Sequence, residues 1–194
     1  ISTDLAVMRP SLLPGLLQAA RRNMDRGATS VRLFEIGRRY MADGEKLTLA
    51  FVLAGDRSPR DWRTGAAQGF DAFDAKAEAL AALAAADAPA DRLMALAPVD
   101  DWYHPGRAGR LCLGPKQALA AFGELHPRVL AAFDLKGGVI AGEIFLDAIP
   151  APKASGKRAR PVYAPPALQP VKRDYAFLVA ADVAADTLVK AVRG

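Results

Sequence analysis

The first part of the chain passes from a hydrophobic pattern typical of a helix to one typical of strands. Residues 13–24 place apolar side chains at helical spacing, with polar side chains on the opposite face. Ser11 can cap this helix, Pro14 fits its first turn and Gly27 is a natural end. The pattern therefore predicts an amphipathic helix at the start of the chain.

A hairpin is predicted directly after this helix. Residues 30–40 and 47–54 are strand-like runs, and Asp43 and Gly44 between them form a hairpin signal. We expect this hairpin to be the centre of an antiparallel sheet, with the rest of residues 1–149 added in layers.

The middle of the chain predicts a second helix and three more strands. Residues 71–88 are rich in alanine, and the helix they predict has a narrow apolar stripe: Phe73, Ala77, Leu80 and Leu83. Strands are expected at 108–113, 118–124 and 139–146, the last as a central strand because its apolar run is nearly continuous. Residues 55–69 are predicted to form a loop anchored by Trp62, and 98–107 an irregular segment.

Composition limits the class of protein. The chain has 194 residues, of which 52% are hydrophobic and 24% charged, so it can bury the core of one large domain, with or without a small one. No apolar run approaches the ~20 residues of a membrane helix. The single Cys112 lies in an apolar run and predicts a reduced core residue in a cytoplasmic protein. Because the chain opens at Ile1 and stops inside a helix-like segment, we expect a fragment of a longer protein.

The net charge of +5 is concentrated in one segment. Residues 150–174 hold six basic residues and one acidic residue, and six prolines lie between positions 150 and 170. The basic residues are Lys153, Lys157, Arg158, Arg160, Lys172 and Arg173. Residues 150–170 are therefore predicted to be an extended linker. Two interpretations of the charge stay open: solvation of this linker, or contact with nucleic-acid phosphates.

A second domain is predicted to begin after the linker. Residues 174–179 resemble a strand, and residues 184–192 predict a helix. One strand and one helix cannot close a core, so residues 171–194 are expected to be a truncated domain.

Candidate chemistry is sparse. His104 and His126 each precede a proline, which favours turn or capping roles over metal or acid–base roles. No metal-ligand spacing, phosphate-binding glycine loop or nucleophile elbow is present in the sequence. Glu35, in an apolar strand, needs a cationic partner, for which Arg9 and Arg38 are the candidates. No catalytic or metal-binding residue is predicted.

Residues 34–40, with the sequence FEIGRRY, resemble the second signature motif of class II aminoacyl-tRNA synthetases. The resemblance implies an α+β fold: a class II synthetase-like antiparallel sheet with flanking helices. Where active members of that class carry an arginine that grips ATP and the substrate carboxylate, this chain has Met41, although Asp43 stands near the acidic position that follows. Since methionine cannot neutralise a phosphate or a carboxylate, the resemblance predicts an inactive site.

Further stretches resemble, in order, the beta subunits of bacterial-type phenylalanine–tRNA ligases. They are residues 8–17, 33–40, 104–107, 123–127 and 170–177. The resemblance implies a C-terminal fragment of such a subunit. Residues 1–149 would be an inactive catalytic-like domain packed on the alpha subunit, and residues 171–194 the start of a ferredoxin-like domain that binds the tRNA anticodon region.

The same resemblance implies the partners and cofactors. The whole enzyme would be a cytoplasmic heterotetramer that joins phenylalanine to tRNA with ATP and magnesium, while this fragment itself would hold no cofactor and contact no membrane. The expected tRNA contacts are Lys172 and Arg173, and after them Lys157, Arg158 and Arg160. Two alternatives are an interaction module of this fold with no tRNA role, and an active class II ligase in which another arginine replaces the one missing at Met41.

Overall fold

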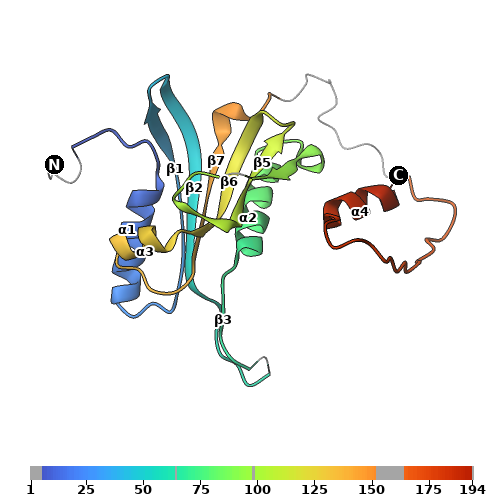
Figure 1. Ribbon diagram of the computed structural model, residues 1–194, viewed down its shortest axis with the longest axis horizontal. Helices are drawn as coiled ribbons and strands as arrows, with labels where there is room; N and C mark the ends of the chain where they lie inside the picture. The colour runs from blue at the N-terminus through green and yellow to red at the C-terminus, as the bar shows by residue number, and fades with distance from the viewer. Residues whose placement is uncertain (1–5, 64, 98, 152–163, 194) are drawn as a thin grey trace. The chain divides into compact units, whose positions relative to one another are not determined.

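The computed structural model describes residues 6–63, 65–97, 99–151 and 164–193 (Figure 1). It divides into two compact units, Ile1–Lys153 and Ala154–Gly194, which are described separately.

A seven-stranded antiparallel sheet forms the centre of the first unit. Its order is β1-β2-β7-β6-β5-β4, and β3 pairs with the far end of β2. The predicted hairpin is confirmed as β1 and β2, and the predicted central strand as β7, which lies between β2 and β6. The strands are β1 (Ser30–Met41), β2 (Gly44–Ser58), β3 (Gln68–Gly69), β4 (Met94–Leu96), β5 (Tyr103–Leu113), β6 (Gln117–Leu125) and β7 (Val139–Phe145).

Helices cover both faces of this sheet. α1 (Leu13–Asp25) and α3 (Pro127–Ala132) lie over one face and α2 (Ala72–Ala85) over the other (Figure 1). Along β2, Ala50, Val52 and Ala54 are buried toward α1, whereas Phe51 and Leu53 are buried toward α2. This period-two alternation places one apolar cluster on each side of the strand. Short 3₁₀ turns, η2 (Ala90–Arg92) and η3 (Leu146–Ala148), complete the unit.

The first helix agrees with the sequence pattern. Its buried residues are Leu13, Leu16, Leu17 and Ala20. Ser11 bonds the start of the helix as expected, since its Oγ accepts the Leu13 N–H at 3.1 Å, although Leu12 occupies the N-cap position. Gly27, at φ +94°, ends the helix and donates its N–H to the carbonyl of Met24.

The second helix begins as predicted, and Leu80 and Leu83 of its predicted apolar stripe pack in the core, but Phe73 and Ala77 are exposed. The Asp71 carboxylate accepts the backbone N–H groups of Phe73 and Asp74 in a capping box. The buried residues are Ala75, Ala79 and Leu83, while Phe73 is 80% exposed. Residues two positions apart in a helix point about 200° away from each other around its axis. Because Ala75 faces the core, Phe73 faces outward.

Two loop predictions are also wrong. β2 continues to Ser58 and β3 pairs back onto it, and Trp62, between these strands, is 90% exposed rather than an anchor. The hairpin that carries Trp62 extends beyond the rest of the sheet (Figure 1). β5 begins at Tyr103, within the segment expected to be irregular, and its pairing with β6 is interrupted between Tyr103 and Ala108.

The second unit has a helix where one was predicted, α4 (Ala185–Arg193). The strand predicted at 174–179 is wrong, because these residues form no β-ladder. A strand needs a hydrogen-bonded neighbour, and no second strand is present among residues 164–193. Large apolar side chains there are exposed, among them Tyr175, Phe177 and Leu178. Within the described part of the chain, no helix has the length and apolar character needed to span a membrane.

Candidate functional site

The class II-like motif lies at the turn between β1 and β2. Arg39 pairs with Lys46 and Met41 with Gly44, and Gly44 has a φ of +116°. The turn borders a hollow of about 390 Å³ beside η3. It is lined by Arg39, Met41, Asp43, Lys46, Leu47, Phe145, Asp147 and Ala148.

The basic groups around this hollow are already bound within the protein. Arg39 donates from Nε to Thr48 Oγ1 at 2.8 Å, and its guanidinium lies 4.6 Å from the centre of the Phe145 ring. Lys46 Nζ lies 2.9 Å from Asp43, and this ammonium lowers the pKa of the Asp43 carboxyl.

Arg9 crosses β1 beside the motif. Its guanidinium forms a 2.7 Å ion pair with Glu35. This confirms that Glu35 has a cationic partner, and of the two candidates, Arg9 and Arg38, the partner is Arg9. Arg9 Nε donates to the Arg38 carbonyl at 3.2 Å, while Tyr40 donates its N–H to the Arg9 carbonyl at 2.9 Å. A Cβ on Gly37 would lie 2.6 Å from Arg9 Nη2, so glycine is what lets the arginine cross at this point.

A buried polar cluster lies on the α1 face of the sheet, next to the same hollow. Glu143 on β7 is 2% exposed, and its carboxylate accepts the Ser11 hydroxyl at 2.9 Å. Burial raises the pKa of this carboxyl. Burial also raises the pKa of Tyr103, whose hydroxyl, like the Trp102 indole N–H, has no hydrogen-bond partner among the described residues. The lone glutamate within the apolar run 139–146 was the sequence signal for this cluster, and our sequence analysis missed it.

The remaining chemistry-bearing residues have structural roles. His126 is the N-cap of α3 and its Nδ1 accepts the Arg128 N–H; His104 Nδ1 accepts the Gly106 N–H. The turn and capping roles predicted for both are confirmed. Cys112 is buried and free, also as predicted. The described residues contain no group of three or more His, Cys, Asp or Glu side chains that could hold a metal ion.

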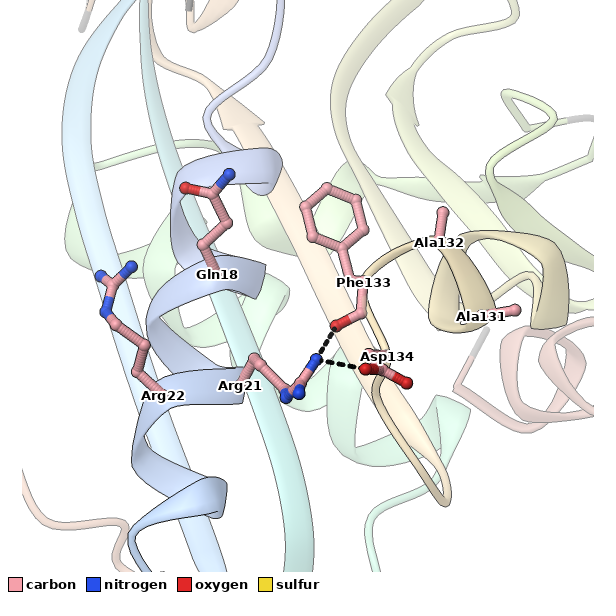
Figure 2. A pocket seen from close by; sticks show the side chains of 7 residues that line it. All are labelled: Gln18, Arg21, Arg22, Ala131, Ala132, Phe133 and Asp134. Carbon is pink, nitrogen blue, oxygen red and sulfur yellow. Dashed lines mark hydrogen bonds and ion pairs between the residues drawn. The ribbon is translucent and has the colours of Figure 1, made fainter. Parts of the chain in front are cut away.

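A second hollow, of about 540 Å³, lies between α1 and α3 (Figure 2). Arg21 on its wall forms ion pairs with Asp25 and Asp134, at 2.7 and 2.8 Å, and donates to the Phe133 carbonyl at 3.4 Å. The pair with Asp25 lies within α1, whereas the bonds to Phe133 and Asp134 join α1 to the segment that follows α3. This hollow is therefore part of the contact between α1 and α3, and we do not consider it a candidate anion-binding site.

The expected tRNA contacts are only partly visible. Lys172 and Arg173 are exposed in the extended part of the second unit. Lys157, Arg158 and Arg160 lie outside the described residues. These five positions stay a prediction.

Comparison with solved structures establishes the class of fold. A pyrrolysyl tRNA synthetase from Desulfitobacterium hafniense superposes with a TM-score of 0.53 at 16% identity, covering 72% of this chain and 47% of that chain. A second structure of pyrrolysyl-tRNA synthetase from that organism gives a TM-score of 0.52 at 18% identity. At such low identity the likeness shows the fold alone, which is that of a class II aminoacyl-tRNA synthetase.

Sequence comparison then identifies the family. Residues 1–146 match the family described as the phenylalanyl tRNA synthetase beta chain CLM domain. The phenylalanine–tRNA ligase beta subunit of Novosphingobium aromaticivorans is 62% identical over 199 residues, and that of Zymomonas mobilis is 55% identical over 194. Each match covers 100% of this chain. The chain belongs to the phenylalanyl-tRNA synthetase beta-chain family.

The chain spans about a quarter of the length of these relatives, 25% and 24% respectively. This shared length does not support the C-terminal position that the sequence suggested.

Proposed function

We propose that this chain is the class II-like part of the beta subunit of a phenylalanine–tRNA ligase, an enzyme that joins phenylalanine to its tRNA with ATP. The family match over residues 1–146, together with relatives matched across the whole chain, is the observation that carries this proposal. The fold agrees with it.

The domain itself has no adenylation activity under this proposal. Met41 holds the position of the ATP-gripping arginine, and the neighbouring Arg39 and Lys46 each make a contact within the protein, to Thr48 and to Asp43. ATP and magnesium would then act on another subunit, the alpha subunit.

An alpha-subunit interface is supported by the uncovered edge of the sheet. β1 is an edge strand, and its Phe34 and Ile36 are 72% and 57% exposed. Beside them is a hollow of about 310 Å³ lined by Phe34, Leu49, Phe51 and residues of α2. Large apolar side chains exposed on an edge strand are unfavourable in water unless another chain or segment covers them.

An RNA-binding role for the second unit is supported by its exposed residues. Lys172 and Arg173 are followed by Tyr175 and Phe177, whose rings stack with centroids 6.3 Å apart. Basic groups beside exposed aromatic rings suit contact with a nucleic-acid strand. We assign this unit to the start of a ferredoxin-like, anticodon-binding domain, in which further strands complete the sheet.

The proposal is tested by mixing residues 1–194 with the alpha subunit and separating the species by size-exclusion chromatography. A stable complex is expected, and the chain alone is expected to show no ATP–pyrophosphate exchange. Exchange by the isolated chain would instead show an active ligase. If the full beta subunit assembles with the alpha subunit but the complex binds no tRNA, the result would favour an interaction module without a tRNA role.

A further inference from the structure

A narrow hairpin, residues 56–69, projects beyond the sheet and away from the helices (Figure 1). We call it the projecting hairpin. Its tip is closed by a pair of backbone bonds between Asp61 and Gly65, at 3.1 and 2.8 Å. The Asp61 carboxylate also accepts the Arg63 N–H at 2.7 Å. The tip is therefore held by its own hydrogen bonds.

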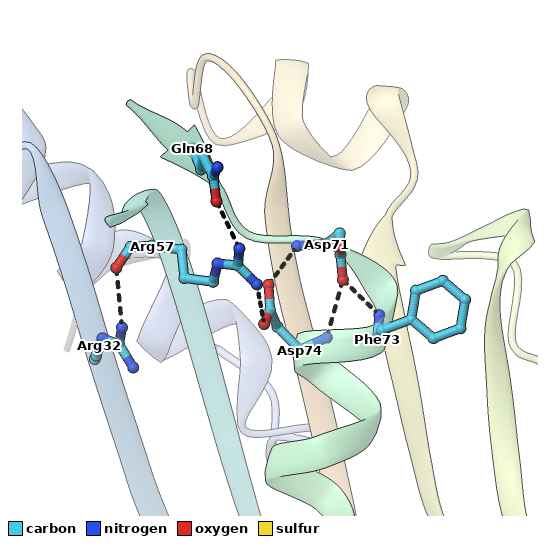
Figure 3. A network of polar contacts seen from close by, with 6 residues as sticks. All are labelled: Arg32, Arg57, Gln68, Asp71, Phe73 and Asp74. Atoms are coloured by element: carbon cyan, nitrogen blue, oxygen red, sulfur yellow. Dashed lines mark hydrogen bonds and ion pairs between the residues drawn. The ribbon is translucent and has the colours of Figure 1, made fainter. Parts of the chain in front are cut away.

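The base of the projecting hairpin is bonded to the rest of the unit (Figure 3). Arg57 donates to Gln68 on the opposite strand at 2.7 Å and to Asp74 of α2 at 3.3 Å. Asp74 belongs to the capping box of α2, because its other oxygen accepts the Asp71 N–H at 3.0 Å. These bonds fix the base, so a ligand at the tip would meet a preorganised surface.

The tip of the projecting hairpin exposes a tryptophan, Trp62, that lies between two arginines in sequence. Trp62 is 90% exposed, Arg60 and Arg63 are exposed on either side, and the Arg63 guanidinium lies 5.8 Å from the indole centroid. A hollow of about 910 Å³ lies beside the indole. Its lining is Arg60, Asp61, Trp62, Gly65, Ala66 and Ala67.

These features favour RNA over a protein partner. A protein interface needs a contiguous apolar centre, but Trp62 is the only large apolar side chain among the described residues of 57–67. The projecting hairpin holds three arginines, Arg57, Arg60 and Arg63, against two carboxylates, Asp56 and Asp61, so its net charge is +1. Arg63 Nε lies 3.7 Å from the Asp61 carboxylate, and both Arg60 and Arg63 remain exposed. One flat aromatic surface with guanidinium groups on both sides suits one unpaired base and its flanking phosphates.

We propose that the projecting hairpin is a tRNA contact, in which Trp62 stacks on an unpaired base and Arg60 and Arg63 bind the adjoining phosphates. This inference rests on the proposed function, and it assigns a contact surface in the first unit, separate from Lys172 and Arg173. Trp62 gives affinity without base identity, because every base has a face on which an indole can stack.

The test uses the full beta subunit assembled with its alpha subunit, and tRNA that accepts phenylalanine. Trp62→Ala is expected to weaken tRNA binding about 5- to 100-fold, whereas Trp62→Phe retains most of the affinity because a phenyl ring still stacks. The double variant Arg60→Gln, Arg63→Gln is expected to lower the slope of log K against log salt by about 1.5. Subunit assembly and ATP–pyrophosphate exchange are expected to be unchanged in all three.

Phe73→Ala is the matched control, since Phe73 is a similarly exposed aromatic residue, 80% exposed, but lies beside Asp71 and Asp74. It is expected to leave tRNA binding unchanged. An equal loss of tRNA affinity in Trp62→Ala and Phe73→Ala, or no loss of tRNA affinity in Trp62→Ala, would overturn the proposal. Weaker subunit assembly in Trp62→Ala would also overturn it, because the indole would then be a protein contact. A wild-type complex that binds no tRNA would refute the proposed function itself.

Discussion

The hydroxyl of Ser11 donates a 2.9 Å hydrogen bond to the buried carboxylate of Glu143. The same hydroxyl accepts the Leu13 N–H at 3.1 Å, so one side chain joins the first turn of α1 to central strand β7. The two residues are 132 positions apart in sequence. This contact fixes the first turn of α1 against the sheet.

The buried carboxyl makes stability depend on pH. Burial raises the pKa of Glu143 above its ordinary 4.5, so the folded chain holds this proton more tightly than the unfolded chain. The stability that this raised pKa contributes is fully present below about pH 4.5. It is lost as pH rises through the folded pKa of Glu143, by at most about 1.4 kcal/mol per pH unit. Glu143→Gln keeps an acceptor for Ser11 and is expected to remove this loss, which urea unfolding from pH 4.5 to 7.5 measures.

Two variants sharpen this measurement. Ser11→Ala removes a bond that lowers the Glu143 pKa, so the loss of stability is expected to shift to higher pH. Glu78→Gln on the exposed side of α2 is the control and is expected to follow the wild-type profile. If the difference in the free energy of unfolding between wild type and Glu143→Gln is constant from pH 4.5 to 7.5, the Glu143 carboxyl does not titrate in that range.

Gly142 on β7 is required by the Phe51 ring. A Cβ at position 142 would lie 2.5 Å from two carbons of that ring, which is packed in the core on the α2 face. We expect Gly142→Ala to destabilise the first unit by about 1–3 kcal/mol, because the ring must leave its packed position to make room for the new methyl group. The measurement is the midpoint of chemical unfolding.

Relief of the same clash is tested by a smaller partner at position 51. The double variant Phe51→Leu, Gly142→Ala is expected to be more stable than the sum of the two single changes predicts. Strict additivity would show that the ring and the new methyl group do not meet.

The sequence could predict the elements whose signal is local. Asp43 and Gly44 marked the hairpin, and the nearly continuous apolar run of β7 marked a strand covered on both faces. His126 before Pro127 marked the start of α3. Each of these patterns lies within a few residues of the structure that it predicts.

The errors arose where tertiary contacts decide. In α2 most positions are alanine, so hydrophobicity could not tell the face that buries Ala75 from the face that exposes Phe73. β4, with three residues, is too short to leave a periodic pattern. The role of Glu143 depended on Ser11 at the other end of the domain, which no local window contains.

The capping box of α2 is expected to contribute measurably to the first unit. Asp71→Ala removes the acceptor for the Phe73 and Asp74 N–H groups, and we expect a loss of about 1–2 kcal/mol in the free energy of unfolding. Asp71→Ser, which keeps an acceptor oxygen, is expected to recover most of it. Equal stability of the alanine and serine variants in urea would contradict a capping role.

Lys172 and Arg173 give the last prediction, for the full beta subunit. Both are exposed and lie in the segment that carries the net positive charge of the chain. If each binds one phosphate, Lys172→Ala with Arg173→Ala weakens tRNA binding and lowers the salt slope by up to about 2. Arg22→Ala on α1 with Arg26→Ala at its C-cap removes the same charge from another exposed surface and is expected to leave the slope unchanged. A slope that is equal in both double variants would remove Lys172 and Arg173 from the contacts with tRNA.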